Sequence, residues 1–196
     1  MTQWRNSAER YGLVAIVLHW LVALTVFGLF GLGLWMVDLD YYDAWYRRGP
    51  ALHKSVGLTL FAVLLLRVGW RRWSPPPLPP STHTALERRA ARVAHLLLYL
   101  LLFALACSGY LISTADGRPI PVFGMFEVPA LPALVEDQED VAGAIHEWLA
   151  WSLVALVAVH ALAALKHHFI DRDATLRRML GVARNPSRSS TEENRP

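Results

Sequence analysis

Long apolar blocks separated by shorter polar segments run along most of the 196-residue chain. A helix needs about 20 mostly apolar residues to cross the hydrocarbon core of a bilayer. Four segments meet this requirement, and we predict spanning helices at residues 12–37, 51–70, 90–113 and 141–169. Because a helix satisfies its own backbone hydrogen bonds in lipid, the pattern predicts an all-α membrane protein folded as a four-helix bundle.

The second of these segments is the weakest membrane candidate, because it carries His53, Lys54 and Arg67. Arg67 lies near the end of the segment, and its long side chain is expected to snorkel to the lipid headgroups. Together the four segments predict a single membrane domain over residues 1–180. The remaining residues, 181–196, are polar and are predicted to form a disordered tail.

Charged residues between the apolar segments are distributed unevenly, and this imbalance orients the predicted bundle. Positive residues gather before the first span, between the second and third spans and after the fourth, whereas acidic residues dominate the other two connections. The positive-inside rule therefore places both termini in the cytoplasm. The basic residues behind this argument are Arg5, Arg10, Arg71, Arg72, Arg88, Arg89, Arg92, Lys166, Arg172, Arg177 and Arg178.

The net charge of +3 does not indicate a nucleic-acid partner, because the basic residues sit at the ends of apolar segments, where contact with a lipid bilayer explains them. The single cysteine, Cys107, excludes an intrachain disulfide. The chain has no Cys-x-x-Cys-His motif, so nothing predicts covalent attachment of haem. Cys107 is interpreted as a small packing residue.

Apart from His167 and His168 at the end of the fourth span, five histidines lie inside the predicted spans, where every ionisable side chain is costly and marks a candidate functional site. From the helix rise, His19 and His160 lie about 10 Å and 13 Å from the inner ends of their spans. His53 and His146 lie about 3 Å and 8 Å from the outer ends of theirs. Because neighbouring spans run in opposite directions, the first two share an inner level and the last two share an outer level.

The fourth span carries two of these histidines on one face. Fourteen residues separate His146 from His160, which is close to four helical turns. The two side chains therefore point the same way, about 21 Å apart along the axis, and other helices offer a partner at each level. Two imidazoles facing each other across a flat cofactor are typical of haem b in a helix bundle, so two haems in the bundle core are the favoured interpretation.

Other interpretations fit parts of this pattern. The histidines could be core residues that form hydrogen bonds between helices, although four of them at two matched levels weaken that reading. A structural zinc site needs four ligands at one level, and each level offers two clear ones. His95 lies about 8 Å from the inner end of its span, close to the level of His19 and His160. Depth alone therefore leaves open which two of these three bind a cofactor.

Five motifs resemble the bacterial cytochrome b561 family, and the likeness keeps order and spacing from about Tyr11 to Leu180. The resemblance implies a four-helix bundle with two b haems in the bacterial inner membrane. The motifs are LHW (18–20), HKSVGLTLFAVLLLRVGWR (53–71), AHLLLYLLLFALACSGY (94–110), HEWLAWSLVALVAVHALAALKHHF (146–169) and DRDATLRRML (171–180).

The resemblance also implies roles for particular histidines. It pairs His19 with His160 and His53 with His146 as axial ligands of the two haem irons, and it implies that His95 is not axial. His167 matches a position associated with the quinone site in the family. The same residue, between Lys166 and His168, would equally suit an ordinary cationic helix end at the headgroups.

The function that the resemblance implies is that of an oxidoreductase, which oxidises superoxide on the periplasmic side and reduces ubiquinone in the membrane. The outer connections are acidic overall, whereas an anion such as superoxide is drawn by positive charge. We nevertheless expect Lys54 and Arg118, together with Arg47 and Arg48, to form a local basic path that draws in the superoxide anion. The alternative is a b-type anchor subunit that passes electrons to quinone from another periplasmic donor, a redox enzyme. A haem-free membrane scaffold or ion carrier is a third hypothesis.

Overall fold

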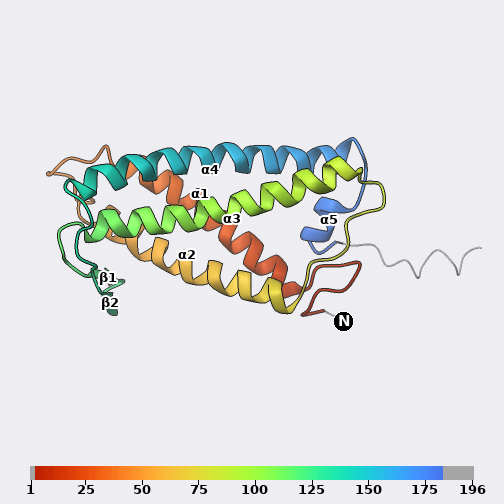
Figure 1. The fold of residues 1–196 in the computed structure, drawn as a ribbon, viewed down its shortest axis with the longest axis horizontal. Coiled ribbons are helices and arrows are strands. Elements are labelled where there is room, and N and C mark those ends of the chain that lie inside the picture. Colours follow the sequence, from red (N-terminus) through yellow and green to blue (C-terminus); the bar gives the residue numbers. More distant parts are fainter. Residues whose placement is uncertain (1–2, 183–196) are drawn as a thin grey trace, which may run out of the picture.

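The computed structural model describes residues 3–182, and Figure 1 shows four long helices that run along the long axis of the molecule. The hairpin β1–β2 lies at one end of the bundle, called here the hairpin end. The N-terminus and α5 lie at the opposite end, called here the terminal end. The elements are α1 (Leu13–Met36), α2 (Arg48–Trp73), α3 (Ala85–Thr114), β1 (Ile120–Val122), β2 (Phe126–Val128), α4 (Gln138–Phe169) and α5 (Thr175–Met179).

The predicted four-helix bundle is confirmed, and its four long helices are each long and apolar enough to cross a membrane. Large apolar side chains cover their outward faces: Leu24, Leu66 and Leu162 are 67%, 66% and 64% exposed. A surface of this kind is stable against lipid tails and not against water. The tail predicted at residues 181–196 lies, apart from its first two residues, outside the described residues.

Three of the long helices extend beyond the apolar segments that predict them, because hydropathy marks the hydrocarbon core while caps and charges mark the helix ends. At the start of α3, the Thr84 hydroxyl accepts a hydrogen bond from the Glu87 amide (3.2 Å), and the Glu87 carboxylate accepts one from the Thr84 amide (2.9 Å). This capping box begins the helix at Ala85 instead of 90. Arg71 and Arg72 occupy the last turn of α2, where positive charge is favourable.

The hairpin β1–β2 has no counterpart among the predicted elements, because three-residue strands leave almost no alternating pattern. Ile120 pairs with Val128 in an antiparallel register, and the turn has left-handed backbone at Phe123 (φ 51°) and Gly124 (φ 70°). β1 packs against α2, and the Ser55 hydroxyl accepts a hydrogen bond from the Phe123 amide (3.1 Å). The segment between α3 and α4 is thereby fixed to the hairpin end of α2.

Candidate functional site

The structure brings four of the membrane histidines together in two pairs, both of which use α4. His53 of α2 faces His146 of α4 with ring centres 6.2 Å apart and planes at 70°. His19 of α1 faces His160 of α4 with ring centres 6.3 Å apart and planes at 61°. The first couple is called here the hairpin-end pair and the second the terminal-end pair. These are the pairings that the sequence leads us to expect.

Both separations suit a metal ion bound between two imidazoles. A metal–imidazole bond is about 2 Å long, and the bonding nitrogen lies about 1.1 Å from the ring centre. Two ligands on opposite sides of one iron therefore have ring centres about 6 Å apart. The residues present thus fit an axial histidine pair at each level, as haem b requires.

Each imidazole of the hairpin-end pair packs against a glycine of a neighbouring helix. A Cβ atom added to Gly33 of α1 would lie 3.3 Å from Cε1 of His53, and one added to Gly109 of α3 would lie 3.2 Å from Cε1 of His146. Both contacts are inside the usual carbon–carbon distance of about 3.5–4.0 Å. α1 and α3 can therefore lie this close to the two imidazoles only because Gly33 and Gly109 lack a side chain.

Hydrogen bonding in the hairpin-end pair leaves ring nitrogens free for a metal. Nδ1 of His146 lies 3.0 Å from the Ser108 hydroxyl, so Ser108 can fix the ring and its tautomer with the proton on Nδ1. Nδ1 of His53 is buried without a hydrogen-bond partner among the described residues. A buried nitrogen with no partner is costly, and it marks a place where a group beyond the polypeptide completes the site.

The terminal-end pair has a different environment, and it corrects one expectation. Arg67 does not snorkel to the headgroups: its Nη2 lies 2.8 Å from Nδ1 of His19, and its guanidinium lies 5.7 Å from the centre of the Tyr99 ring. The expectation was wrong because hydropathy reports depth and not the partners that a charge finds inside the bundle. With Arg67 donating to Nδ1, a neutral His19 carries its proton on Nε2. If His19 bound a metal through Nε2, its proton would have to move to Nδ1. Nδ1 could then no longer accept a hydrogen bond, and Arg67 would turn to another acceptor.

His95 lies beside the terminal-end pair but at a different spacing. Its ring centre is 5.4 Å from that of His160, shorter than the about 6 Å that two axial imidazoles require. The ring of His19, at 6.3 Å, suits that requirement better. The structure thus gives His95 the position of a neighbour of the pair.

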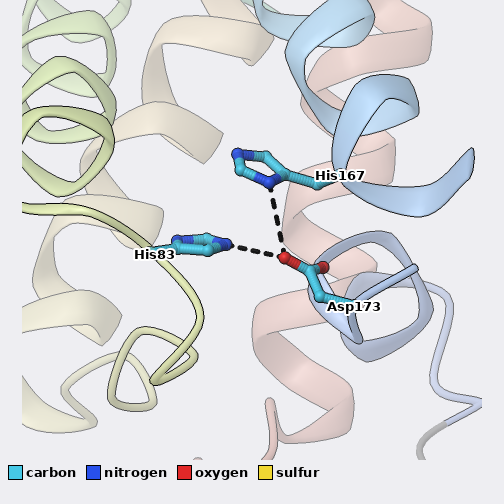
Figure 2. A group of neighbouring side chains, drawn as sticks. All are labelled: His83, His167 and Asp173. Carbon is cyan, nitrogen blue, oxygen red and sulfur yellow. Dashed lines mark hydrogen bonds and ion pairs between the residues drawn. The ribbon is translucent and has the colours of Figure 1, made fainter. Parts of the chain in front are cut away.

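His167 lies at the terminal end, among groups that the pattern of apolar segments does not indicate. Figure 2 shows His167 and His83 pointing at the same carboxylate, that of Asp173. Nε2 of His83 lies 2.8 Å from Oδ2 of Asp173, and Nδ1 of His167 lies 3.4 Å from the same atom. The two imidazoles are stacked, with ring centres 4.3 Å apart. His83 and Asp173 could not be found from hydropathy, because both lie in irregular segments outside the spans.

The Asp173 side chain is 4% exposed, and burial by itself raises the pKa of a carboxyl group. Hydrogen bonds from Thr175 and His83, with a smaller contribution from His167, outweigh that effect and lower the pKa of Asp173 below its ordinary value. Asp173 is therefore an ionised carboxylate held between two imidazoles at neutral pH.

Lys54 and Arg118, expected to guide an anion, lie at the hairpin end near a shared acid. Nε of Arg118 donates to Oδ2 of Asp116 at 2.6 Å. Hydrogen bonds from Arg118 lower the pKa of Asp116, and the charge of Lys54 lowers it further. Both cations therefore lie near one carboxylate, and Asp116 partly offsets their positive field. Lys54 is next in sequence to His53.

Comparisons with known proteins agree with this architecture. The profile of the family described as prokaryotic cytochrome b561 matches residues 10–182. "Cytochrome b561 homolog 2" of Escherichia coli K12 is 58% identical over 176 residues, which cover 90% of this chain and 94% of that protein. "Probable superoxide oxidase CybB" of Yersinia pestis is 30% identical over 174 residues, covering 88% and 96% of the two chains. "Cytochrome b561 homolog 1" of E. coli K12 is 27% identical over 180 residues, covering 88% and 97%.

The chain therefore belongs to the prokaryotic cytochrome b561 family, whose members bind haem b and transfer electrons in a membrane.

Proposed function

We propose that this member of the prokaryotic cytochrome b561 family carries electrons across the bacterial inner membrane through two b haems. The observation that supports the proposal is the presence of two imidazole pairs, 6.2 Å and 6.3 Å between ring centres, built on one shared helix. His53 and His146 would hold one haem at the hairpin end, on the periplasmic side. His19 and His160 would hold the other nearer the terminal end, on the cytoplasmic side with both termini.

When bound, haem would supply reversible one-electron transfer between the two ends. The polypeptide supplies the rest. Paired histidines would hold each haem iron from both sides and so would favour electron transfer over direct binding of oxygen. Ser108 orients the His146 ring, and the glycines behind the hairpin-end pair allow the helices to approach it closely.

For the donor and acceptor, we propose superoxide at the hairpin end and ubiquinone at the terminal end. Two superoxide anions would each give up one electron and leave as oxygen, while one quinone takes two electrons and two protons to become quinol. The similarity to the Yersinia protein named as a probable superoxide oxidase supports this donor. Lys54 and Arg118 would attract the anion, and His167 would contact the quinone.

Visible spectroscopy of the purified protein tests each part separately. A dithionite-reduced b-type spectrum with two haems per chain is the expected result, and a colourless protein would remove the proposal entirely. In stopped-flow mixing, superoxide should reduce the haems and added ubiquinone should reoxidise them. If superoxide leaves the haems oxidised while a co-purifying redox enzyme reduces them, the protein is instead the anchor subunit of that enzyme.

A further inference from the structure

Three side chains from separate segments form a compact cluster at the terminal end, away from both membrane pairs. His83 comes from the connection before α3, His167 from the last turn of α4 and Asp173 from the segment that leads to α5. One ligand atom from each lies within 4.8 Å of the other two. The side chains of His83, His167 and Asp173 are 10%, 13% and 4% exposed. The three side chains therefore form a compact and largely buried cluster, and Figure 2 shows its geometry.

The backbone holds these side chains in place. The Thr175 amide donates to Oδ1 of Asp173 (2.7 Å), which leaves Oδ2 directed at the two imidazoles. The Asp173 amide donates to the carbonyl of His167 (3.0 Å), and the His83 amide donates to the carbonyl of Pro80 (3.1 Å). Such support from surrounding groups orients ligands before a metal arrives.

Hydrogen bonds alone leave the cluster incomplete. Nδ1 of His167 is buried and has no hydrogen-bond partner of acceptable geometry among the described residues, although Oδ2 of Asp171 and Oδ2 of Asp173 lie 2.7 Å and 3.4 Å away. One oxygen of Asp173 thus faces two imidazole nitrogens. A single cation placed between Oδ2 of Asp173 and the two imidazole nitrogens would be bound by all three atoms.

We propose that His83, His167 and Asp173 form a binding site for a divalent transition metal of the zinc type. Two imidazoles and a carboxylate suit zinc, whereas magnesium and calcium prefer oxygen ligands alone. Ligands bound at about 2.0–2.1 Å in a tetrahedron lie about 3.3 Å apart. The observed separations of 2.8 Å and 3.4 Å require only small adjustments to reach that value. A water molecule would complete the coordination.

The neighbouring carboxylates favour this location over an adjacent one. Glu87, His167 and Asp171 also gather within ligand distance of one another. The Lys166 ammonium, however, lies 2.7 Å from Glu87 and 2.8 Å from Asp171, so a cation already occupies the space between those two acids. Asp173 has no such lysine partner among the described residues, and its charge remains for the metal.

Zinc binding to the haem-loaded protein in detergent tests the proposal without any electron donor or quinone. Protein carrying no polyhistidine tag and treated with a chelator is titrated with Zn²⁺ in a calorimeter. We expect one zinc ion per chain, and at least tenfold weaker binding for His83→Gln and Asp173→Asn. His168→Gln is the matched control, because His168 follows His167 on the same helix and lies outside the cluster; it should bind zinc like the wild type. An unchanged haem spectrum shows that each variant is folded.

X-ray absorption at the zinc edge of the wild type gives a second test that needs no variant. We expect a first shell of nitrogen and oxygen only, with the scattering pattern of two imidazoles. A wild type that binds no stoichiometric zinc, a zinc shell without imidazole, or equal affinity in Asp173→Asn and wild type would each overturn the proposal. None of these results depends on whether superoxide or quinone is a substrate.

Discussion

Gly33→Ala is the sharpest test of the hairpin-end pair. The new Cβ would lie 3.3 Å from Cε1 of His53, about 0.2 Å inside the lower limit of about 3.5 Å for carbon–carbon contacts. A free imidazole relieves such an overlap by turning slightly. An imidazole bonded to iron through a fixed distance cannot turn without straining that bond, so the overlap falls on the haem-bound state.

The expected size of the effect follows from other overpacked sites. Inserting one methyl group into a tightly packed interior costs about 1–3 kcal/mol. At about 1.4 kcal/mol for each factor of ten, haem at this level should bind about 5-fold to 150-fold more weakly. The terminal-end pair, with His19 and His160, does not contact Gly33 and should keep its haem. Gly109→Ala should act in the same way through His146, because its Cβ would lie 3.2 Å from Cε1 of that ring.

The assay is the haem-to-protein ratio together with the reduced-minus-oxidised spectrum after purification. Gly31→Ala is the matched control on the same helix, because a Cβ there meets no atom within 4 Å beyond its own helix and chain neighbours, among the described residues. We expect Gly31→Ala to keep the wild-type ratio while Gly33→Ala falls towards half of it. Equal haem content and identical spectra in the two variants would refute the claim that His53 is an axial ligand pressed against α1.

Three further predictions concern the surroundings of the two pairs. His19→Gln should lose the haem of the terminal-end pair, whereas His95→Gln should keep both haems, and the pyridine haemochrome assay counts them. Arg67→Gln should lower the midpoint potential of that haem in a redox titration, because a nearby positive charge stabilises the reduced form. Hydrogen bonds from Arg118 keep the pKa of Asp116 below its usual value, so Asp116 stays charged and offsets Arg118 at neutral pH. Asp116→Asn should therefore speed reduction by superoxide in stopped-flow mixing, with the gain shrinking as salt is added.

Helix-level features of the fold were predictable because they depend on local repetition. Apolar blocks gave four spans, and the rise and period of a helix put His146 and His160 on one face at two depths. Neither inference needs to know how the helices pack. The same arithmetic could not choose between His19 and His95 as the partner of His160, since that choice depends on how α1 and α3 rotate against α4.

Features built from irregular segments were not predictable in this way. Asp173 is positioned by a hydrogen bond from the Thr175 amide, and His83 by a turn from Pro80, and neither contact leaves a periodic trace in the sequence. Arg67 was misplaced for a related reason. Hydropathy treats a charge near the end of a span as a cost to be relieved by water, and it cannot anticipate the Nδ1 atom of His19 inside the bundle.

The two histidine pairs also differ in a way that bears on the direction of electron flow. The hairpin-end pair is surrounded by Gly33, Gly109 and the neutral hydroxyl of Ser108, while the terminal-end pair has the Arg67 guanidinium beside it. Inside a membrane protein the effective dielectric constant is low, so a positive charge beside the pair acts strongly on an electron that arrives nearby, even after Arg67 has turned to another acceptor. With haem bound between His19 and His160, the Arg67 charge would stabilise an added electron at the terminal end. Under the proposed function, that effect would favour flow from a donor at the hairpin end towards a quinone at the terminal end.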